Sequence, residues 1–249
     1  MNSPTRTSRL SGAEVDEYRR LGYVLFQQPV FGAAAFARLG AIFEEDLGRY
    51  GEDDLDTIHF RDPRLLEFLL SDDILDLVEP LVGPDIGLWS SHFISKPPRT
   101  GKATPWHTDA DYWRDRTSGA AGICTLWLAI DQVNTENGCM RVIPGSHLGG
   151  PSEYEAVSRD SNIFGRQIRS DQIDERKAVD FELHPNECSL HEARIIHGAA
   201  ANTSERRRAG YTMRYFPTTI RIDADHPMNR GHRIWLARGR DRAGNTYES

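Results

Sequence analysis

The chain of 249 residues carries a formal net charge of −7, and 39% of its residues are hydrophobic. This composition excludes low-complexity disorder, and the negative charge argues against nucleic-acid or anionic-membrane partners. Three widely spaced cysteines, no apolar signal core in the first ten residues and no run of about 18 apolar residues argue against a disulfide framework, secretion and membrane insertion, so we expect a soluble, cytoplasmic chain.

The first third of the chain predicts helices on the outside of a single domain that spans residues 1–249. Residues 1–10 are expected to form a disordered lead. Ser11 followed by Glu14 predicts the capping box of a helix that ends at Gly22. Apolar residues spaced by three and four predict the remaining helices. They are expected over about 33–49, 63–70 and 72–81, with a short strand at 23–26 before them.

From Ile86 to about Pro217 the sequence changes to short β segments separated by Gly, Pro and Asn turns, which predicts a β-barrel core over residues 86–217. The expected strands are 86–96, 123–131, 140–143, 178–183, 189–196 and 208–216. Residues 149–175 are polar and have no pattern, which predicts a long loop that acts as a lid or binds substrate. The charged tail after Arg221 is expected to be an irregular strap. The three cysteines predict buried thiols.

The triplet His107-Thr108-Asp109 is the first candidate metal motif. On an extended strand, residues i and i+2 point to the same face about 6.6 Å apart, so both side chains could reach one metal ion. Two imidazoles and one carboxylate leave open positions on iron, which an Fe(II) oxygenase requires. About one such triplet is expected by chance in a chain of this composition, so a third ligand must carry the assignment.

Two histidines further along the chain could complete this site. His191 and His197 are six residues apart and share a face of a regular strand, where they would lie about 20 Å from each other, so only one could bind the metal. Because six is an even number of residues, the alternation of side chains along a strand does not distinguish the two histidines. We favour His197 because Gly198 and a preceding apolar pair indicate a buried strand. A hairpin would bring Arg208 near this histidine, and a guanidinium is suited to the far carboxylate of a dicarboxylate.

Several blocks in this order resemble the phytanoyl-CoA dioxygenase (PhyH-like) family over residues of about 10–217. They are Lys96-Pro97-Pro98, Thr104–Asp109, Tyr112-Trp113, Leu126–Asp131, Asn137–Met140, Pro144–His147, Leu190-His191, His197-Gly198, Asn202, Arg208 and Tyr211. This resemblance implies a double-stranded β-helix, a jelly-roll of the cupin type that is mainly β with flanking helices. It also implies a non-haem oxygenase that uses Fe(II), 2-oxoglutarate and O₂.

Carried over by residue, the resemblance implies an iron site and a co-substrate site. The implied iron ligands are His107, Asp109 and His197. Arg208 is implied to anchor 2-oxoglutarate, and Trp127 to form the barrel wall beside it, with Thr125 on the same face and Lys96 close to the co-substrate. The chain departs from the family pattern at Thr108, where Gln is common, and at Ala199, where Ser or Thr is common. These departures concern the hydrogen bonds to 2-oxoglutarate.

The resemblance favours hydroxylation of a small metabolite or natural-product intermediate. Asp109 disfavours halogenation, because halogenating relatives lack a carboxylate at this position. Residues expected at the substrate mouth are Asp111, Tyr112, Trp113 and Arg214. Two alternatives stay open: a cupin-like metal-binding sensor or binding module without oxygenase activity, and a zinc hydrolase with the same ligands. The sequence indicates neither the substrate nor the oligomeric state.

Overall fold

The computed structural model describes residues 10–248. The predicted disordered lead, residues 1–10, lies outside the described residues except at its last position. Leu10 is buried in the hydrophobic core that the helices form with the sheet, so the prediction was wrong for this residue. Among the described helices, none is long and apolar enough to cross a membrane.

The helices follow the predicted order. They are α1 (Gly12–Leu21), α2 (Ala33–Tyr50), α3 (Leu66–Leu69), α4 (Asp72–Val82) and α5 (Ala110–Trp113). The capping box at the start of α1 is present, since Ser11 accepts a hydrogen bond from the Glu14 amide and the Glu14 side chain accepts one from the Ser11 amide. Gly22 ends α1 in the left-handed region at φ 84°, where a side chain would also collide with the His147 ring.

The strands form two larger antiparallel sheets and one hairpin. They are β1 (Tyr23–Phe26), β2 (Ile86–Lys96), β3 (Thr104–His107), β4 (Cys124–Ala129), β5 (Met140–Val142), β6 (Tyr154–Ala156), β7 (Arg166–Ile168), β8 (Val179–Asp180), β9 (Cys188–Glu192), β10 (His197–Ala199), β11 (Arg208–Pro217) and β12 (Trp235–Arg238). The major sheet has the order β1-β9-β4-β11-β2-β12, and the minor sheet has the order β3-β10-β5-β8. Their hydrogen bonds leave two separate sheets in the described chain rather than one closed barrel.

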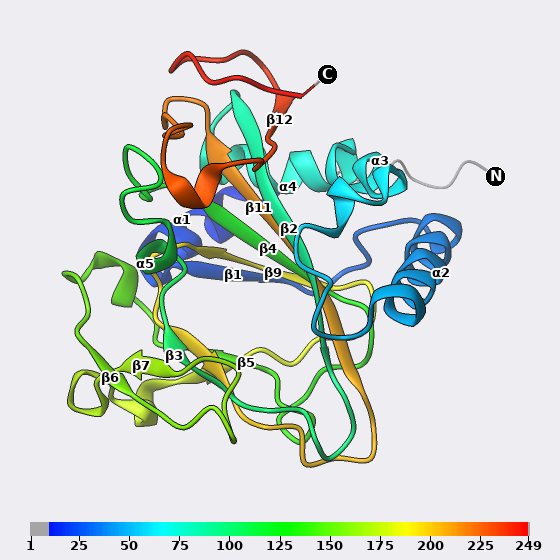
Figure 1. Cartoon of the computed structure of the whole chain (residues 1–249), viewed down its shortest axis with the longest axis vertical. Coiled ribbons are helices and arrows are strands. Elements are labelled where there is room, and N and C mark those ends of the chain that lie inside the picture. Colours follow the sequence, from blue (N-terminus) through cyan, green and yellow to red (C-terminus); the bar gives the residue numbers. More distant parts are fainter. Residues whose placement is uncertain (1–9, 249) are drawn as a thin grey trace.

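The two faces of the major sheet have different partners. Along β4, Cys124, Leu126 and Leu128 pack into the core shared with α1, α2 and α4, whereas Trp127 and Ala129 belong to the core between the sheets. This is the alternation that the sequence predicts for a strand. Figure 1 shows the major sheet across the middle of the molecule, the helices beyond one side of it and the minor sheet on the other side. The jelly-roll prediction is therefore confirmed as two facing antiparallel sheets.

Three segments differ from the predicted elements. The predicted strand 189–196 is broken by a turn at residues 193–196, which separates β9 from β10. The patternless stretch 149–175 contains the β6–β7 hairpin, and the charged tail adds β12 to the edge of β2. The sheet thus extends on both sides of the predicted core range 86–217, because β1 and β12 are its edge strands. The cysteines are free and buried, as predicted.

Candidate metal centre

Three buried side chains meet between the two sheets. One ligand atom from each of His107, Asp109 and His197 can be chosen so that all lie within 4.8 Å of one another. His107 and His197 are direct partners across the β3–β10 ladder, and their ring centroids are 4.1 Å apart. Cross-strand pairing therefore sets the spacing of the two imidazoles. The structure brings together the triad that the sequence predicts.

The backbone at Asp109 differs from the extended geometry that the sequence argument assumed. β3 ends at His107, and Asp109 has helical dihedrals (φ −62°, ψ −37°) at the start of α5. Its carboxylate approaches the metal position because the chain turns there, not because residues i and i+2 share a strand face. Oδ1 of Asp109 lies 4.0 Å from Nε2 of His107.

Hydrogen bonds orient the two imidazoles. Nδ1 of His107 lies 2.8 Å from the Pro105 carbonyl oxygen, and Nδ1 of His197 lies 3.1 Å from the Ile195 carbonyl oxygen. A ring that donates from Nδ1 presents an unprotonated Nε2, which is the form that binds a metal ion. Burial and the neighbouring His197 lower the pKa of His107 to about 3, so this ring is neutral at physiological pH.

Asp109 is held by two donors from the major sheet. Its Oδ2 accepts a hydrogen bond from the Thr125 hydroxyl at 3.1 Å and lies 3.4 Å from Nε of Arg214. Burial by itself would raise the pKa of Asp109, but Arg214 and His197 outweigh it and keep that pKa well below its usual range. The carboxylate is therefore ionised, and its other oxygen, Oδ1, faces the imidazoles.

The triad lines a cavity of about 360 Å³, and Arg208 lies in its wall. Arg208 is 3% exposed, its Cζ is 4.9 Å from the centroid of the Trp127 ring, and its Nε donates to the Gly138 carbonyl. The absence of a side chain at Gly210 leaves room for the Trp127 indole. No carboxylate of the described residues pairs with this guanidinium, and burial lowers its pKa to about 10. A buried, unpaired cation requires an anionic partner, and a dicarboxylate co-substrate would supply one.

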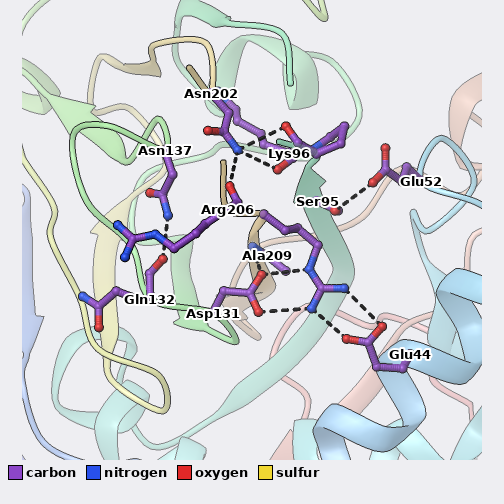
Figure 2. A network of polar contacts seen from close by, with 12 residues as sticks. Glu44, Glu52, Ser95, Lys96, Asp131, Gln132, Asn137, Asn202, Arg206 and Ala209 are labelled. Carbon is purple, nitrogen blue, oxygen red and sulfur yellow. Dashed lines mark hydrogen bonds and ion pairs between the residues drawn. The ribbon is translucent and has the colours of Figure 1, made fainter. Parts of the chain in front are cut away.

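Lys96 lies behind this wall rather than in it. It is the cross-strand partner of Arg208, and its Nζ donates to the Ala200 carbonyl at 2.5 Å. Figure 2 shows Asn202 above it, where the amide of Asn202 donates to the carbonyls of Lys96 and Arg206 and fixes the turn before β11. Burial and Arg208 lower the pKa of Lys96 to about 6. The Lys96 amine is therefore mostly neutral above pH 6, and it lies next to Arg208 without lining the cavity.

The prediction that His191 and His197 lie too far apart for both to reach one metal ion was wrong. Because the chain turns between β9 and β10, the two ring centroids are 5.1 Å apart instead of about 20 Å. His191 also lines the cavity, 2% exposed, and both of its ring nitrogens lack a hydrogen-bond partner in the described chain. Burial and His197 lower its pKa to about 3. The three-atom cluster nevertheless contains His197 and not His191.

Of the four residues predicted at the substrate mouth, three line the metal cavity and one does not. Tyr112, Trp113 and Arg214 line the metal cavity. Asp111 does not; it lines a neighbouring hollow, where it accepts hydrogen bonds from the hydroxyls of Thr108 and Tyr154. Arg214 is paired with Asp109, so its charge is already engaged before any substrate binds.

The structure shows where Thr108 and Ala199, the two departures from the family pattern, lie relative to the metal cavity. Thr108 bonds to Asp111 and points away from the metal cavity. Ala199 lines the cavity and brings no hydroxyl to it. Thr125 supplies the hydroxyl that Asp109 uses, so its contact is to the carboxylate ligand.

Sequence reasoning missed several cavity residues, among them His92, Arg116 and Phe164. His92 carried a usable signal, since it is an inward position of β2 opposite Thr212. Arg116 and Phe164 lie in irregular segments, where periodicity gives no information about the direction of a side chain.

The donor set fits a divalent metal ion. It combines two imidazoles and an ionised carboxylate on one side of a cavity, which is the arrangement of non-haem iron sites with open positions. The fold and the site define a jelly-roll protein in which a His/Asp/His cluster and a buried arginine without a carboxylate partner share one cavity.

Comparison with known proteins assigns the chain to a family. The sequence pattern of phytanoyl-CoA dioxygenase (PhyH) matches residues 10–210, so this chain belongs to the PhyH family. A probable phytanoyl-CoA dioxygenase of Caenorhabditis elegans is 32% identical over 162 residues, which are 62% of this chain and 51% of the relative. The chain thus spans about half the length of that curated relative.

Two solved structures share the fold. The non-heme monooxygenase ThoJ in its apo form superposes with a TM-score of 0.78 at 26% identity and covers 94% of this chain and 87% of its own. The non-heme alpha-ketoglutarate-dependent carbocyclase SnoK from nogalamycin biosynthesis has a TM-score of 0.74 at 24% identity and covers 91% of this chain and 93% of its own. The second likeness supports the fold alone.

Proposed function

We propose that this protein is a cytoplasmic non-haem Fe(II)- and 2-oxoglutarate-dependent dioxygenase that hydroxylates a small metabolite or natural-product intermediate. One observation carries the proposal: a buried His107–Asp109–His197 cluster and the unpaired guanidinium of Arg208 share one cavity. A metal-binding module without this chemistry would not need a buried cation whose charge is unbalanced until a dicarboxylate binds.

In this proposal each residue has a defined task. His107, Asp109 and His197 hold the metal, and Arg208 binds the far carboxylate of 2-oxoglutarate. When bound, iron and 2-oxoglutarate would activate O₂, so that one oxygen atom converts a C–H bond to C–OH and the other enters succinate as 2-oxoglutarate loses CO₂. The protein positions the substrate and excludes water from the buried site.

Thr125 and Arg214 have a supporting task. By binding Oδ2 of Asp109 they leave Oδ1 on the side of the imidazoles, where it would be available to hold the metal. Such support typically changes metal affinity or activity by about 10- to 100-fold. Trp127 covers the Arg208 side chain and gives the co-substrate site an apolar wall.

The test is spectroscopic and chemical. Anaerobic addition of Fe(II) and 2-oxoglutarate should produce a visible metal-to-ligand charge-transfer band, and admission of air should yield succinate, faster when a substrate is present. Asp109→Ala should remove both signals. A protein that binds Fe(II) but gives neither signal would instead be a cupin-like sensor or binding module, and O₂-independent activity with Zn(II) would indicate a hydrolase.

A further inference from the structure

A second guanidinium without a carboxylate partner lies at the other end of the metal cavity. β11 runs along the wall from Arg208 to Arg214, a distance of about 20 Å for six strand residues. Ser90 pairs with Arg214, and the next residue toward that end is Trp89. Cζ of Arg116 lies 5.1 Å from the centroid of the Trp89 ring, and Arg116 lines the cavity. Arg208 and Arg116 therefore line the same cavity and lie toward different ends of its β2–β11 wall.

Neutral groups hold Arg116 in place. Its Nε donates to Oδ1 of Asn229 at 2.8 Å, and its Nη2 donates to the Met228 carbonyl at 3.2 Å. The amide of the buried Asn229 donates in turn to the Arg116 carbonyl at 2.9 Å. In the described chain its Nη1 has no hydrogen bond and no carboxylate lies within 4.0 Å. The guanidinium is thus oriented in advance, with donors to spare.

The charges in the cavity leave Arg116 unbalanced. Arg214 is paired with Asp109, and in the proposed complex one carboxylate of 2-oxoglutarate would meet Arg208 and the other the metal ion, so neither is left for Arg116. The opposing carboxylate is Asp56 at the cavity rim, whose side chain is 68% exposed and lies 3.7 Å from the His92 ring. Water screens a carboxylate this exposed, so it compensates a half-buried arginine only weakly.

Aromatic side chains line the cavity that contains Arg116 and the metal cluster. Trp113 is buried, and the Cζ of Arg214 lies 5.7 Å from its ring. The Phe164 ring centroid lies 5.2 Å from that of His107, and Tyr112 lies 5.5 Å from Phe164. These rings can cover an apolar body, and none of them carries a carboxylate that would balance Arg116.

Resting on the proposed oxygenase function, we propose that the substrate is an organic carboxylate: its carboxylate binds Arg116, and its apolar or aromatic body packs against Trp113 and Phe164. The acid group and the oxidised carbon then lie at different ends of the substrate. The co-substrate and the substrate then each have their own arginine, Arg208 and Arg116, in the same cavity.

The experiment compares acids with their amides. The anaerobic Fe(II) protein is saturated with 2-oxoglutarate, which occupies Arg208, and binding of 3-phenylpropionate and indole-3-acetate is compared with that of their primary amides. The readout is paramagnetic broadening of the ligand proton signals. A charge-assisted bond predicts about tenfold or greater preference for the acids. Arg116→Gln should abolish the preference, Arg116→Lys should retain part of it, and the exposed Arg221→Gln should leave it unchanged.

Each outcome of the binding comparison either supports or overturns the role of Arg116. Equal binding of acids and amides, no binding of either at millimolar concentration, or a preference that survives Arg116→Gln would overturn the role of Arg116. The charge-transfer band in the same samples reports the proposed function separately. A band that persists in Arg116→Gln shows that the iron site is folded, whereas no band in the wild-type protein removes the oxygenase function and this inference with it.

Discussion

Arg214 lies with its Nε 3.4 Å from Oδ2 of Asp109, although the two residues come from β11 and from the start of α5. The Thr125 hydroxyl binds the same oxygen. Both donors belong to the major sheet, and they leave Oδ1 free on the side of the imidazoles. The orientation of the carboxylate is thus set by the sheet that does not carry the histidine ligands.

Replacement of Arg214 should therefore weaken metal binding without removing a ligand. We expect Arg214→Gln to lower Fe(II) affinity by about 10- to 100-fold, because the carboxylate loses its charged support. Thr125→Val should have a smaller effect, since the bond it removes is neutral on the donor side. Competition with a chromogenic chelator measures both values. An unchanged affinity in Arg214→Gln would show that the contact does not orient Asp109.

Arg208 should determine the affinity for 2-oxoglutarate. Arg208→Met removes the charged fork and should raise the dissociation constant of 2-oxoglutarate by about 10- to 100-fold. Titration of the charge-transfer band measures it. Arg206→Met, two residues earlier and exposed, is the matched control and should behave like the wild-type protein. Equal effects of the two substitutions would mean that only the general positive charge of the region matters.

Lys96 should make 2-oxoglutarate binding depend on pH. Its pKa is about 6 in the protein without co-substrate, so its amine is mostly neutral above that pH. A dianion beside Arg208 favours the charged amine and raises this pKa, so binding takes up a proton, and affinity should fall as pH rises through the raised pKa. Calorimetry in buffers of different ionisation enthalpy detects the proton. Lys96→Met should eliminate the buffer dependence; a wild-type binding enthalpy that is independent of buffer would contradict the prediction.

Tyr154 should hold the segment 149–175 closed. Its hydroxyl donates to Oδ2 of Asp111 at 2.7 Å, and Ile163 and Phe164 of the same segment line the metal cavity. Tyr154→Phe should accelerate amide exchange in 149–175 by about tenfold or more, since a hydrogen bond to a carboxylate contributes roughly 1.5 to 3 kcal/mol. Tyr247→Phe, which removes a similar bond to Asp241 in the tail, is the control. Amide exchange that is unaffected by Tyr154→Phe would show that the hydrogen bond from Tyr154 to Asp111 does not hold this segment in place.

The longer helices and strands were predictable, and the turns and several short elements were not. Strand 86–96 agrees with β2 at both ends, because alternation and flanking Gly and Pro residues define it. The turn at 193–196 was missed because Ile195 and Ile196 continue an apolar run, so only the backbone shows that His191 and His197 face each other. The same limit applies to Asp109, whose position depends on a change from strand to helix between His107 and Ala110.

Some residues of the site were also predictable from the sequence, and others were not. Residue types in a fixed order indicated His107, Asp109, His197 and Arg208 before any geometry was known. Arg116 could not be found in this way, because its position depends on Asn229 and Trp89, which are distant in the sequence and follow no shared pattern. Contacts between irregular segments are fixed by tertiary packing, and a linear pattern does not record them.

The two sheets contribute unequal parts of the metal cluster. His107 and His197 belong to the minor sheet, whereas Asp109 is fastened to the major sheet through Thr125 and Arg214. A metal ion bound to all three would therefore act as a cross-link between the sheets. Its removal would free them to separate or slide at this edge, so metal loading should raise the thermal stability of the jelly-roll as well as complete the site.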